Sequence, residues 1–480
     1  MKDTATTAAD RPHSKGDRIP ARRIDGDGTS NARFDFEGTY AVASIVLNGK
    51  IVGDDCANDS QWEYSLNGKD WKPAIAGGSC GEQARYVRVS GPVAALPDTD
   101  IQFIADSGFA VEPADEWTNL FHKKQSWSGS DGIYSIPVNG VEAHGTAART
   151  TTVFVFGDTF VGNVDERTDA RDPSTAMLNN TLGIMDGAEP DPEKLRFVWR
   201  EGENGDPLSA IVPTTPKATS HHDTYYWLQD GASIGGHYHG FPLIIGHDPD
   251  GPEGFQFAVH GITHVTAPLT AAGPDLSRVK QTDTPLYFKS AGGHTTYFGA
   301  AIMPNTAEAG VPQPDGYVYI YGLQHNGIHQ LVAARVLPED LADIGQWTYW
   351  NGGEWTDRKE DCAPIAPEVS CELSVSRMTG GSLDGKYVVL CQLGGTTGNR
   401  LAIYSGDSPV GPFGASTPLY YCPESEEGRG IYTYNAKGHP HLSAPGELLI
   451  SYNVNTTSME ANMAYGSIYR PRFVRLRQIP

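Results

Sequence analysis

The sequence predicts an all-β protein, and its turn-forming residues, aromatic content and lack of helical periodicity are the observations that predict it. The 480 residues include 55 glycines and 33 prolines, and 10% are aromatic. Long stretches with a 3.6-residue hydrophobic period are nearly absent. Short apolar runs bounded by Asp-Gly and Asn-Gly pairs are typical of strands joined by tight turns. We expect a five-bladed β-propeller preceded by a small β-sandwich. Four or six blades, or a two-sheet sandwich of this size, are the alternatives.

Five apolar runs are the clearest expected strands. They are rich in β-branched and aromatic residues, which strands favour, and turn pairs such as Asp315-Gly316 and Asp384-Gly385 separate them. The runs span residues 151–156, 317–321, 330–337, 386–393 and 447–452. The segment 338–344 (PEDLADI) is the only one whose composition indicates a helix, and it is long enough for one or two turns.

The pattern divides the chain into three segments. We expect residues 1–33 to be a disordered polar leader, residues 34–112 a small β-sandwich and residues 113–480 a propeller. Within 34–112, the WEYSLNGKDW segment followed by RYVRV resembles carbohydrate-binding sandwiches, although a purely structural role is favoured. In the third segment strands recur in groups of about four, and Trp127 followed by Asp131-Gly132 is echoed by Trp227 followed by Asp230-Gly231.

The net charge of the chain disfavours some classes of binding partner. Its 36 basic and 58 acidic residues give a net charge of −22, which repels phosphate backbones and anionic lipids, so we expect no nucleic-acid partner. Solubility alone is the alternative explanation of this charge.

No apolar run approaches the ~20 residues of a membrane span. Residues 1–18 lack the apolar core of a signal peptide. We interpret them as a start methionine joined to a trimmed mature sequence, and we expect a secreted protein.

The six cysteines predict three disulfides. They are an even number and lie as near neighbours in loops rich in Gly and Asp, a pattern typical of secreted proteins. We expect Cys56 to pair with Cys80, Cys362 with Cys371, and Cys391 with Cys422. The alternative is six reduced thiols in a cytosolic protein. Neither a CxxC pair nor a Cys/His cluster with zinc spacing is present, so we expect no metal centre.

Four acidic residues are candidate catalytic groups, because hydrolysis of a glycosidic bond needs two carboxyl groups. Asp131 heads the first predicted blade, and Asp158 follows an apolar run in VFVFGDTF. Asp230 is the repeat counterpart of Asp131, and Glu372 lies in the alternating segment CELSVSR, where a glutamate is unusual in a strand. The alternatives are a turn-capping role for the aspartates and a solvent-facing position for Glu372.

Aromatic and polar residues beside these acids are candidates for substrate binding. Aromatic faces stack on sugar rings, so Trp127, Tyr134 and Trp227 are candidates, with burial in the core as the alternative. Asn435 and His439 belong to the polar segment YTYNAKGHPH. His439 could hydrogen-bond a substrate, hold a metal at the propeller axis or hold a loop in place.

The triplet Arg171-Asp172-Pro173 resembles the RDP motif of fructan-cleaving propellers. It lies in the charged segment VDERTDARDPS and lacks their preceding Asn-Asp-Pro signature. We interpret it as a coincidence or as an ion pair that positions the loop.

Several segments together resemble the endo-D-arabinanases of glycoside hydrolase family 183, formerly a domain of unknown function. The matching segments are DGIYSIPV, TTVFVFGDTFVG, LNNTLGIMDG, CELSV and YNAKGHP, and GDSPVGPF resembles a motif of many five-bladed glycosidases. The resemblance implies a five-bladed propeller acting on furanose-containing polysaccharide. It implies Asp131 and Asp158 as the first catalytic candidates, then Glu372, with Asp230 adjusting the pKa of the acid and Asn180 binding substrate.

The residues and the resemblance predict a secreted glycoside hydrolase that cleaves furanosidic linkages, with D-arabinan of arabinogalactan or lipoarabinomannan as substrate. A non-catalytic glycan-binding propeller and a fructan- or L-arabinan-active glycosidase are the alternatives. We expect no cofactor requirement, with a structural calcium ion at the propeller axis as an open alternative. The patterns do not indicate an oligomeric state.

Overall fold

Strands dominate the regular structure, and two units divide the chain. The computed structural model describes residues 18–26, 30–48, 50–51, 60–75, 79–80, 83–221, 223–251, 256–395, 398–428 and 430–479. One unit comprises Met1–Glu112 with Arg477–Pro480, and the other Pro113–Leu476. The elements are strands apart from short helical turns, which confirms the all-β part of the predicted fold class.

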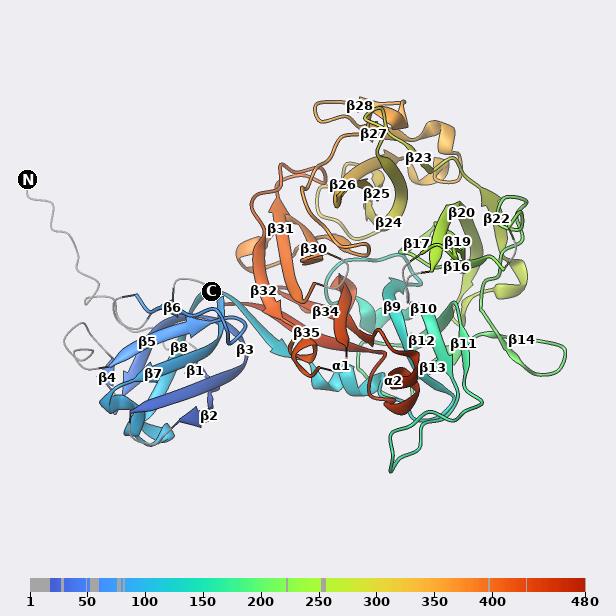
Figure 1. The fold of residues 1–480 in the computed structure, drawn as a ribbon. Coiled ribbons are helices and arrows are strands. Elements are labelled where there is room, and N and C mark those ends of the chain that lie inside the picture. The colour runs from blue at the N-terminus through green and yellow to red at the C-terminus, as the bar shows by residue number, and fades with distance from the viewer. Residues whose placement is uncertain are drawn as a thin grey trace, which may run out of the picture. The chain divides into compact units, whose positions relative to one another are not determined.

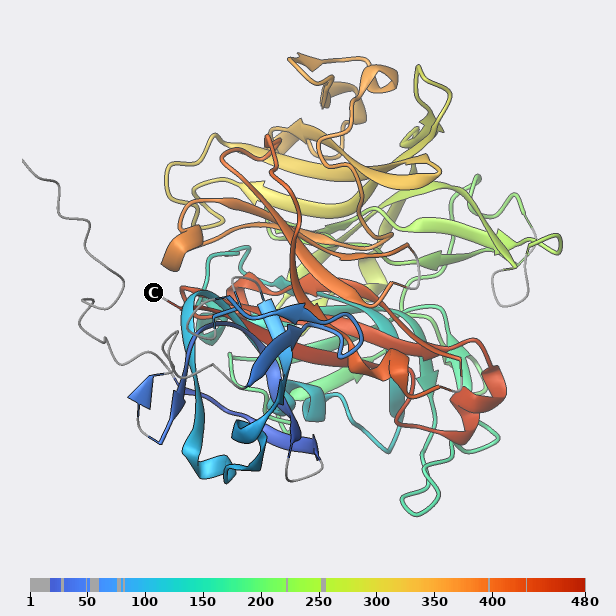
Figure 2. The ribbon, with the colours of Figure 1, turned by 60° about the vertical axis from the view of Figure 1, so that its left-hand side comes forward.

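The smaller unit is an antiparallel sheet with the strand order β8-β3-β7-β5-β6, and Figure 2 shows how strongly it curves. Its strands are β1 (Arg18–Ile19), β2 (Arg22–Gly26), β3 (Asn31–Leu47), β4 (Lys50–Ile51), β5 (Gln61–Ser65), β6 (Lys72–Pro73), β7 (Gln83–Ser90) and β8 (Ile101–Pro113). The rings of Phe34, Phe36 and Trp62 meet Phe103 edge-on at centroid distances of 5.6, 5.0 and 6.2 Å. These aromatic contacts form the centre of its core.

The expected disordered leader is wrong for the part of 1–33 that the structure describes. Strand β1 pairs with β8, and strand β2 pairs with β3. Ile19 is 2% exposed in the core, and Arg23 forms an ion pair with Asp98. Burial of an apolar side chain and sheet hydrogen bonds therefore order a segment whose polar composition predicted disorder. Residues 1–17 and 27–29 lie outside the described residues.

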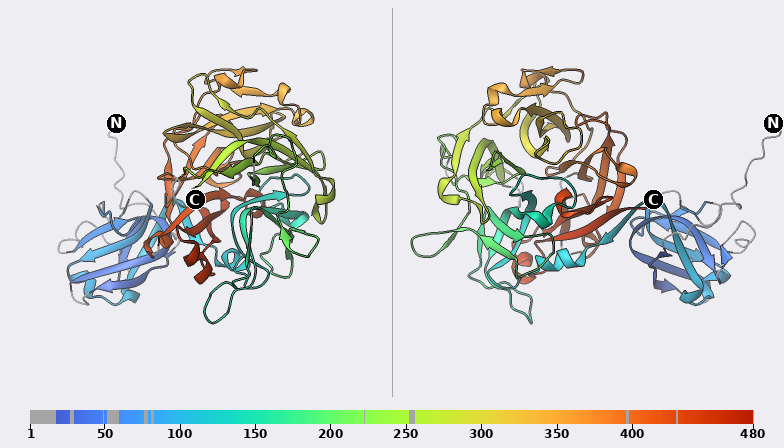
Figure 3. Two further views of the ribbon diagram at one scale, coloured as in Figure 1. Left: turned by 45° about the vertical axis from the view of Figure 1, so that its right-hand side comes forward. Right: turned by 180° about the vertical axis from the view of Figure 1, so that it is seen from behind.

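The larger unit is a succession of antiparallel sheets, which Figures 1 and 3 show arranged around a common centre in chain order. The first contains β9 (Trp127–Pro137), β10 (Thr151–Val161), β11 (Ala176–Leu178), β12 (Thr181–Asp186) and β13 (Leu195–Val198), and the hairpin β14 (Arg200–Glu201) and β15 (Pro207–Leu208) follows. The second contains β16 (Tyr225–Trp227), β17 (Gly231–Ile234), β18 (His237–Gly240), β19 (Leu243–His247), β20 (Phe257–Thr270), β21 (Gly273–Pro274) and β22 (Lys280–Asp283).

The remaining sheets have the same antiparallel pattern. The third contains β23 (Tyr287–Lys289), β24 (Thr295–Asn305), β25 (Tyr317–Asn326), β26 (Ile328–Val336), β27 (Thr348–Trp350) and β28 (Trp355–Thr356). The fourth contains β29 (Ser374–Arg377), β30 (Tyr387–Leu393), β31 (Arg400–Gly406) and β32 (Thr417–Tyr421), and the run β33 (Ile431–Gly438), β34 (Glu447–Thr456) and β35 (Arg470–Ile479) follows. The five apolar runs expected to be strands fall in β10, β25, β26, β30 and β34. Their starts agree to within two residues, but β10, β25 and β34 extend four or five residues beyond the expected ends.

The inner strands of these sheets form a closed ring. Strand β9 contacts β17, β17 contacts β24, β24 contacts β29, β29 contacts β33, and β33 returns to β9. Each of these strands starts or nearly starts its sheet in chain order, so residues remote in sequence meet at the centre. This closure positions the site described below.

Two short α-helices were not expected from the sequence. Helix α1 (Asp115–Leu120) buries Trp117 and Leu120, and helix α2 (Met459–Ala464) begins where the side chain of Ser458 accepts a hydrogen bond from the backbone N–H of Ala461. Each spans fewer than two turns, which is too short for a helical period to be visible in the sequence. The expected helical segment at 338–344 contains a 3₁₀ turn at Pro338–Asp340.

Two of the three expected disulfides are wrong. Cys362 and Cys391 are unpaired thiols, so neither can bond its expected partner, Cys371 or Cys422. Each is buried in a different apolar cluster of the larger unit, and burial raises the pKa of both thiols to about 12. The third expected disulfide involves Cys56, which lies outside the described residues.

The buried thiols predict a specific alkylation pattern. Because thiolate is the reactive form, Cys362 and Cys391 should resist iodoacetamide in the folded protein at pH 7.5. They should react fully in guanidinium without any reductant. Peptide mass spectrometry measures both states. A requirement for reductant before these two cysteines become alkylated would contradict the structure.

Candidate active site

Asp131 and Asp158 lie opposite one another on paired strands, at an irregularity of the ladder. Strand β10 pairs with β9 through Phe156 with Gly132 and through Thr159 with Ser130, and the register shifts between these two pairs. Two residues of β10 therefore oppose the single residue Asp131, which is the arrangement of a β-bulge. Both carboxyl groups belong to partly exposed residues in a region that is otherwise buried.

The backbone around the pair is tightly constrained. Ile133 has a φ of 80°, a conformation that is unfavourable for a β-branched residue. A Cβ atom at Gly157 would lie 2.4 Å from Oδ1 of Asp131, so only glycine leaves room for this carboxyl group. Unusual backbone geometry of this kind is commonest at functional sites, where the surrounding structure enforces it.

Two tyrosines hold Asp131. The hydroxyl groups of Tyr434 and Tyr469 donate to Oδ2 of Asp131 over 2.9 and 3.1 Å, and the side-chain amide of Asn455 donates to the Tyr434 hydroxyl over 3.2 Å. Burial, together with the negative charges of Asp158 and Glu372, raises the pKa of Asp131 well above its usual range, while the two tyrosine hydroxyls oppose the rise.

Asp158 accepts hydrogen bonds from two side chains. The indole Nε1–H of Trp227 donates to Oδ1 over 3.1 Å, and the amide of Asn179 lies 3.5 Å from the same atom. Burial raises the pKa of Asp158 to about 7, and both hydrogen bonds oppose the rise. At neutral pH this carboxyl group is therefore divided between its protonated and ionised forms, as a general acid or base requires.

Asp230 directly precedes β17 and faces β24. Its Oδ1 accepts from the N–H of Gly231 and its Oδ2 from the N–H of Ile302, both over 2.8 Å. Burial raises the pKa of Asp230 to about 7, whereas Lys437 lowers it. Both carboxyl oxygens bind backbone amides, so this side chain is held in one orientation between two inner strands.

Glu372 forms an ion pair with a fully buried lysine. The Nζ atom of Lys437 contacts the Glu372 carboxylate and donates to the carbonyls of Gly132 and Asn435 over 3.0 and 3.2 Å. The amide of Asn435 donates to Oε1 of Glu372 over 3.1 Å. Burial lowers the pKa of Lys437, and the charges of Glu372, Asp131 and Asp230 raise it. The negative charges of three predicted acids thus raise the pKa of one ammonium group. The charge of the fourth, Asp158, raises the pKa of Asp131.

Four of the predicted substrate-binding residues are instead buried structural residues. Trp127 is fully buried and stacks on Phe197 at 4.4 Å. Tyr134 is 3% exposed and donates its hydroxyl hydrogen to the carbonyl of Ala300. These aromatic side chains follow the commoner fate of aromatics, which is burial in the core.

The two polar residues among these four are likewise satisfied inside the protein. The Asn180 side chain exchanges hydrogen bonds with the backbone of Ile211 and donates to the carbonyl of Tyr226. His439 is fully buried between the hydroxyls of Ser135 and Ser451, at 2.7 and 2.8 Å. Burial lowers its pKa, so the ring is neutral and holds two strands together. Trp227 and Asn435 remain beside the acids.

Sequence reasoning missed four residues that contact the acids. They are Tyr434 and Tyr469 on Asp131, Asn179 on Asp158, and Lys437 on Glu372. Tyr434 and Lys437 lie in the same YNAK segment as Asn435, and Asn179 directly precedes Asn180. The signal for these residues was therefore present, but it does not specify which member of each segment faces the acid. Tyr469 carried no such signal.

Arg171 of the RDP triplet hydrogen-bonds the backbone of segments that carry site residues. Its guanidinium donates to the carbonyls of Ser128 and Ile468 over 2.8 and 3.1 Å and also to that of Asn462. It lies 4.4 Å over the ring of Phe160. These bonds go to backbone carbonyls, which differs from the expected loop ion pair. The hydrogen bonds connect β9, which carries Asp131, with the segment that delivers Tyr469, and the contact with Phe160 adds β10, which carries Asp158.

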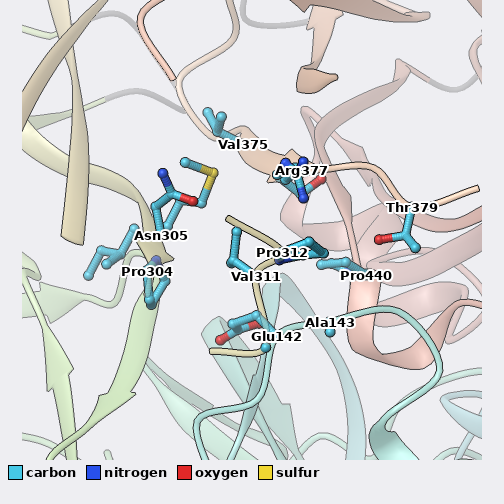
Figure 4. A pocket seen from close by; sticks show the side chains of 14 residues that line it. Glu142, Ala143, Pro304, Asn305, Val311, Pro312, Val375, Arg377, Thr379 and Pro440 are labelled. Carbon is cyan, nitrogen blue, oxygen red and sulfur yellow. The ribbon is translucent and has the colours of Figure 1, made fainter. Parts of the chain in front are cut away.

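A pocket lies toward the opposite ends of the inner strands. Asp131 and Asp158 lie within β9 and β10, and Asp230 and Glu372 lie just before β17 and β29. This pocket is instead lined by Asn305, Arg377 and Pro440 at or beyond the ends of β24, β29 and β33. Figure 4 shows these side chains with Glu142 around Val311 and Pro312. Burial and the charge of Asp230 raise the pKa of Glu142. The pocket does not include the four candidate acids.

The described residues contain neither a group of metal ligands nor a membrane-spanning helix. In this part of the chain no three His, Cys, Asp or Glu side chains are grouped as metal ligands. No helix within it has the length and apolar character of a membrane span.

The raised pKa of Asp158 predicts a stability change with pH. The folded protein binds this proton more tightly than the unfolded chain, where the pKa is near 3.8. Stability should therefore fall as the pH rises from 4 to 7, and the loss is complete above pH 7. Asp158→Asn removes the effect and retains an acceptor for Trp227. We expect its Tm to exceed that of the wild type by about 2–4 °C at pH 8, with little difference at pH 4.

The matched control is Asp172→Asn, which makes the same chemical change outside the acid cluster. Its Tm should follow the wild type at both pH values, as measured by scanning calorimetry. An Asp158→Asn variant that is less stable than the wild type at pH 8 would show that the carboxylate is a favourable interaction there.

A structure from Bacteroides ovatus, described as a "putative hydrolase", superposes with a TM-score of 0.59 at 20% identity, covering 77% of this chain and 90% of that one. The two share a fold. A GH43 β-xylosidase/α-arabinofuranosidase from a compost metagenome gives 0.38 at 11% identity, covering 75% and 92%. An exo-β-1,3-galactanase from Phanerochaete chrysosporium gives 0.36 at 10%, covering 73% and 64%.

Sequence comparison identifies the family. No curated protein matches the chain. The model of the family described as domain of unknown function (DUF5005) matches residues 114–478, which contain the closed ring and all four candidate acids. The description of this family names no activity, so the resemblance to the endo-D-arabinanases stays a prediction. The chain belongs to the DUF5005 family.

Proposed function

We propose that the chain is a glycoside hydrolase and that its ring of sheets is a five-bladed β-propeller presenting the catalytic carboxyl groups. The observation that carries the proposal is the pairing of Asp131 with Asp158 on adjacent strands, each held by its own hydrogen-bond donors. Glycosidases need one carboxyl group to donate a proton and a second to act as base or nucleophile. The likeness in fold to the Bacteroides ovatus protein, whose description also denotes hydrolysis, agrees with this chemistry.

The pair can supply both groups that the reaction needs. Burial raises the pKa of both carboxyl groups, so near neutral pH one of them can hold a proton while the other is ionised. The protonated aspartate protonates the glycosidic oxygen as the carboxylate of the other bonds to the anomeric carbon and the leaving sugar departs. The first aspartate, now ionised, then takes a proton from the water that hydrolyses the sugar–aspartate ester.

Glu372 and Asp230 support this pair. The Glu372–Lys437 ion pair places a fixed positive charge beside the acids, and Asp230 adds a carboxyl group held by two backbone amides. Both groups alter the electric field at the catalytic pair and therefore the pKa values of its two carboxyl groups. Trp227 binds Asp158 and is partly exposed, so its ring is the candidate surface for stacking on a sugar.

The proposed substrate is a furanose-containing polysaccharide, and D-arabinan is the first choice. This choice rests on the motifs around Asp131, Asp158 and Asn435, which resemble those of endo-D-arabinanases. A net charge of −22 suits a neutral glycan better than a phosphate-bearing polymer. Secretion and activity without a cofactor are parts of the same proposal.

A substrate panel tests the proposal. Arabinogalactan, lipoarabinomannan, inulin and L-arabinan are incubated with the protein, and the products are separated by chromatography. We expect hydrolysis of the D-arabinan-containing polymers. Asp131→Asn and Asp158→Asn should each lower the rate by a factor of roughly 100 to 10,000. Asp172→Asn is the control and should retain it. Binding of a polysaccharide without turnover would instead support a lectin.

The position of the two acids on neighbouring strands predicts the stereochemical outcome. Paired strands lie about 4.7–4.9 Å apart, so carboxyl groups carried on them can approach to the separation of about 5–5.5 Å found in retaining glycosidases, whereas inverting ones need a wider spacing. We expect the first-formed product to keep the anomeric configuration of the substrate, as measured by proton NMR before mutarotation. An inverted product would exclude a nucleophilic role for either aspartate.

A further inference from the structure

A second pocket, distinct from the acid cluster, lies on the second sheet of the larger unit. Strands β18, β20 and β22 are antiparallel neighbours, with β20 and β22 visible side by side in Figure 1. His239 pairs with Thr266, and Thr266 pairs with Lys280. Because side chains alternate along a strand, these three residues project from one face of the sheet. The same alternation adds His237 and His264 to that face.

The opposite face of these strands is core. Tyr238, Val265 and Ala267, which alternate with the polar residues, are 2%, 0% and 1% exposed. The polar face is not a flat surface. It forms the floor of a pocket that Arg278 and Ala342 also line. The pattern therefore places histidine, threonine and lysine side chains together in a concave site.

Every charged or titratable side chain that lines the pocket is basic. The lining residues include three histidines, Arg278 and Lys280, and none of them is an aspartate or glutamate. This composition is the reverse of the chain as a whole, in which acidic residues outnumber basic ones by 58 to 36. Neither Arg278 nor Lys280 forms an ion pair among the described residues. The carboxylate that acts on Arg278 is Asp275, which binds the backbone and hydroxyl of Ser277.

The two inner histidines are fixed in place. Nδ1 of His239 and Nε2 of His264 are 3.1 Å apart and share one hydrogen, and the rings stack at a centroid distance of 5.3 Å. His264 is 4% exposed and stacks on Phe241 at 4.7 Å. Because these imidazole groups are already held in place, they lose little conformational entropy when a ligand binds.

We propose that this pocket binds an oxyanion: the carboxylate of an acidic sugar or a sulfate or phosphate group. Guanidinium and ammonium groups supply the positive charge, and imidazole and threonine hydroxyl groups supply further donors. A metal cation does not suit the pocket, because Arg278 and Lys280 would repel it. The site is separate from the acids on β9 and β10, so this inference does not depend on the proposed hydrolase activity.

Calorimetric titration of the full chain tests the proposal. The probes are sodium sulfate, sodium glucuronate and neutral glucose, at pH 6.5 in a buffer without oxyanions and at ionic strength fixed with sodium chloride. We expect sulfate or glucuronate to bind with a dissociation constant on the order of 1 mM, and glucose to bind at least tenfold more weakly. Tighter binding of glucuronate identifies a sugar carboxylate as the ligand, and tighter binding of sulfate identifies a sulfate or phosphate group.

A pair of matched variants locates the binding. The double variant Arg278→Gln/Lys280→Gln should weaken anion binding at least tenfold. The control Arg200→Gln/Lys289→Gln changes the net charge equally at exposed positions elsewhere and should bind like the wild type. Thermal denaturation verifies that both variants are folded. Absence of binding by either anion, equal binding of glucose, or an equal loss in the control would overturn the proposal.

Discussion

The arrangement at the centre of the larger unit depends on one buried ammonium group. Lys437 is fully buried, contacts the Glu372 carboxylate and donates to backbone carbonyls on β9 and β33. It also lies 4.4 Å over the ring of Tyr134. A single side chain thus joins three members of the closed ring. A buried charge is tolerated only when it is paired and hydrogen-bonded, so the acids and the lysine require one another.

One positive charge does not neutralise four carboxyl groups. Burial raises the pKa of Asp158 and Asp230 to about 7, so near neutral pH part of the cluster is protonated rather than ionised. The cluster therefore costs stability as the pH rises, and the surrounding structure must offset that cost. Apolar clusters between the sheets and the hydrogen bonds of Arg171 to five backbone carbonyls supply rigid support around the acids.

The sequence located the acids better than it located their partners. Asp131 and Asp158 were recognisable because each lies where an apolar strand pattern is interrupted by a turn-forming pair, and that signal is local. Tyr469 contacts Asp131 across 338 positions, and no local pattern reports such a contact. Trp127 was misassigned because an aromatic residue beside an acid has the same sequence signature whether it stacks on a sugar or on Phe197. Cys362 and Cys391 were misassigned because even number and spacing do not reveal burial.

The long separation between the acids and their tyrosines follows from how the ring closes. Asp131 and Asp158 belong to the first sheet, whereas Tyr434 lies on β33 and Tyr469 directly precedes β35, both in the last part of the ring. The hydrogen bonds to Asp131 span 303 and 338 residues and cannot form until the last strands meet the first. Contacts of such separation form late in folding because closing a long loop costs entropy before the contact is gained. The hairpin of β9 and β10 places both carboxyl groups, but only ring closure adds the two tyrosine donors that stabilise charge on Asp131. The electrostatic environment of Asp131 is therefore a property of the complete ring rather than of the hairpin that carries both acids.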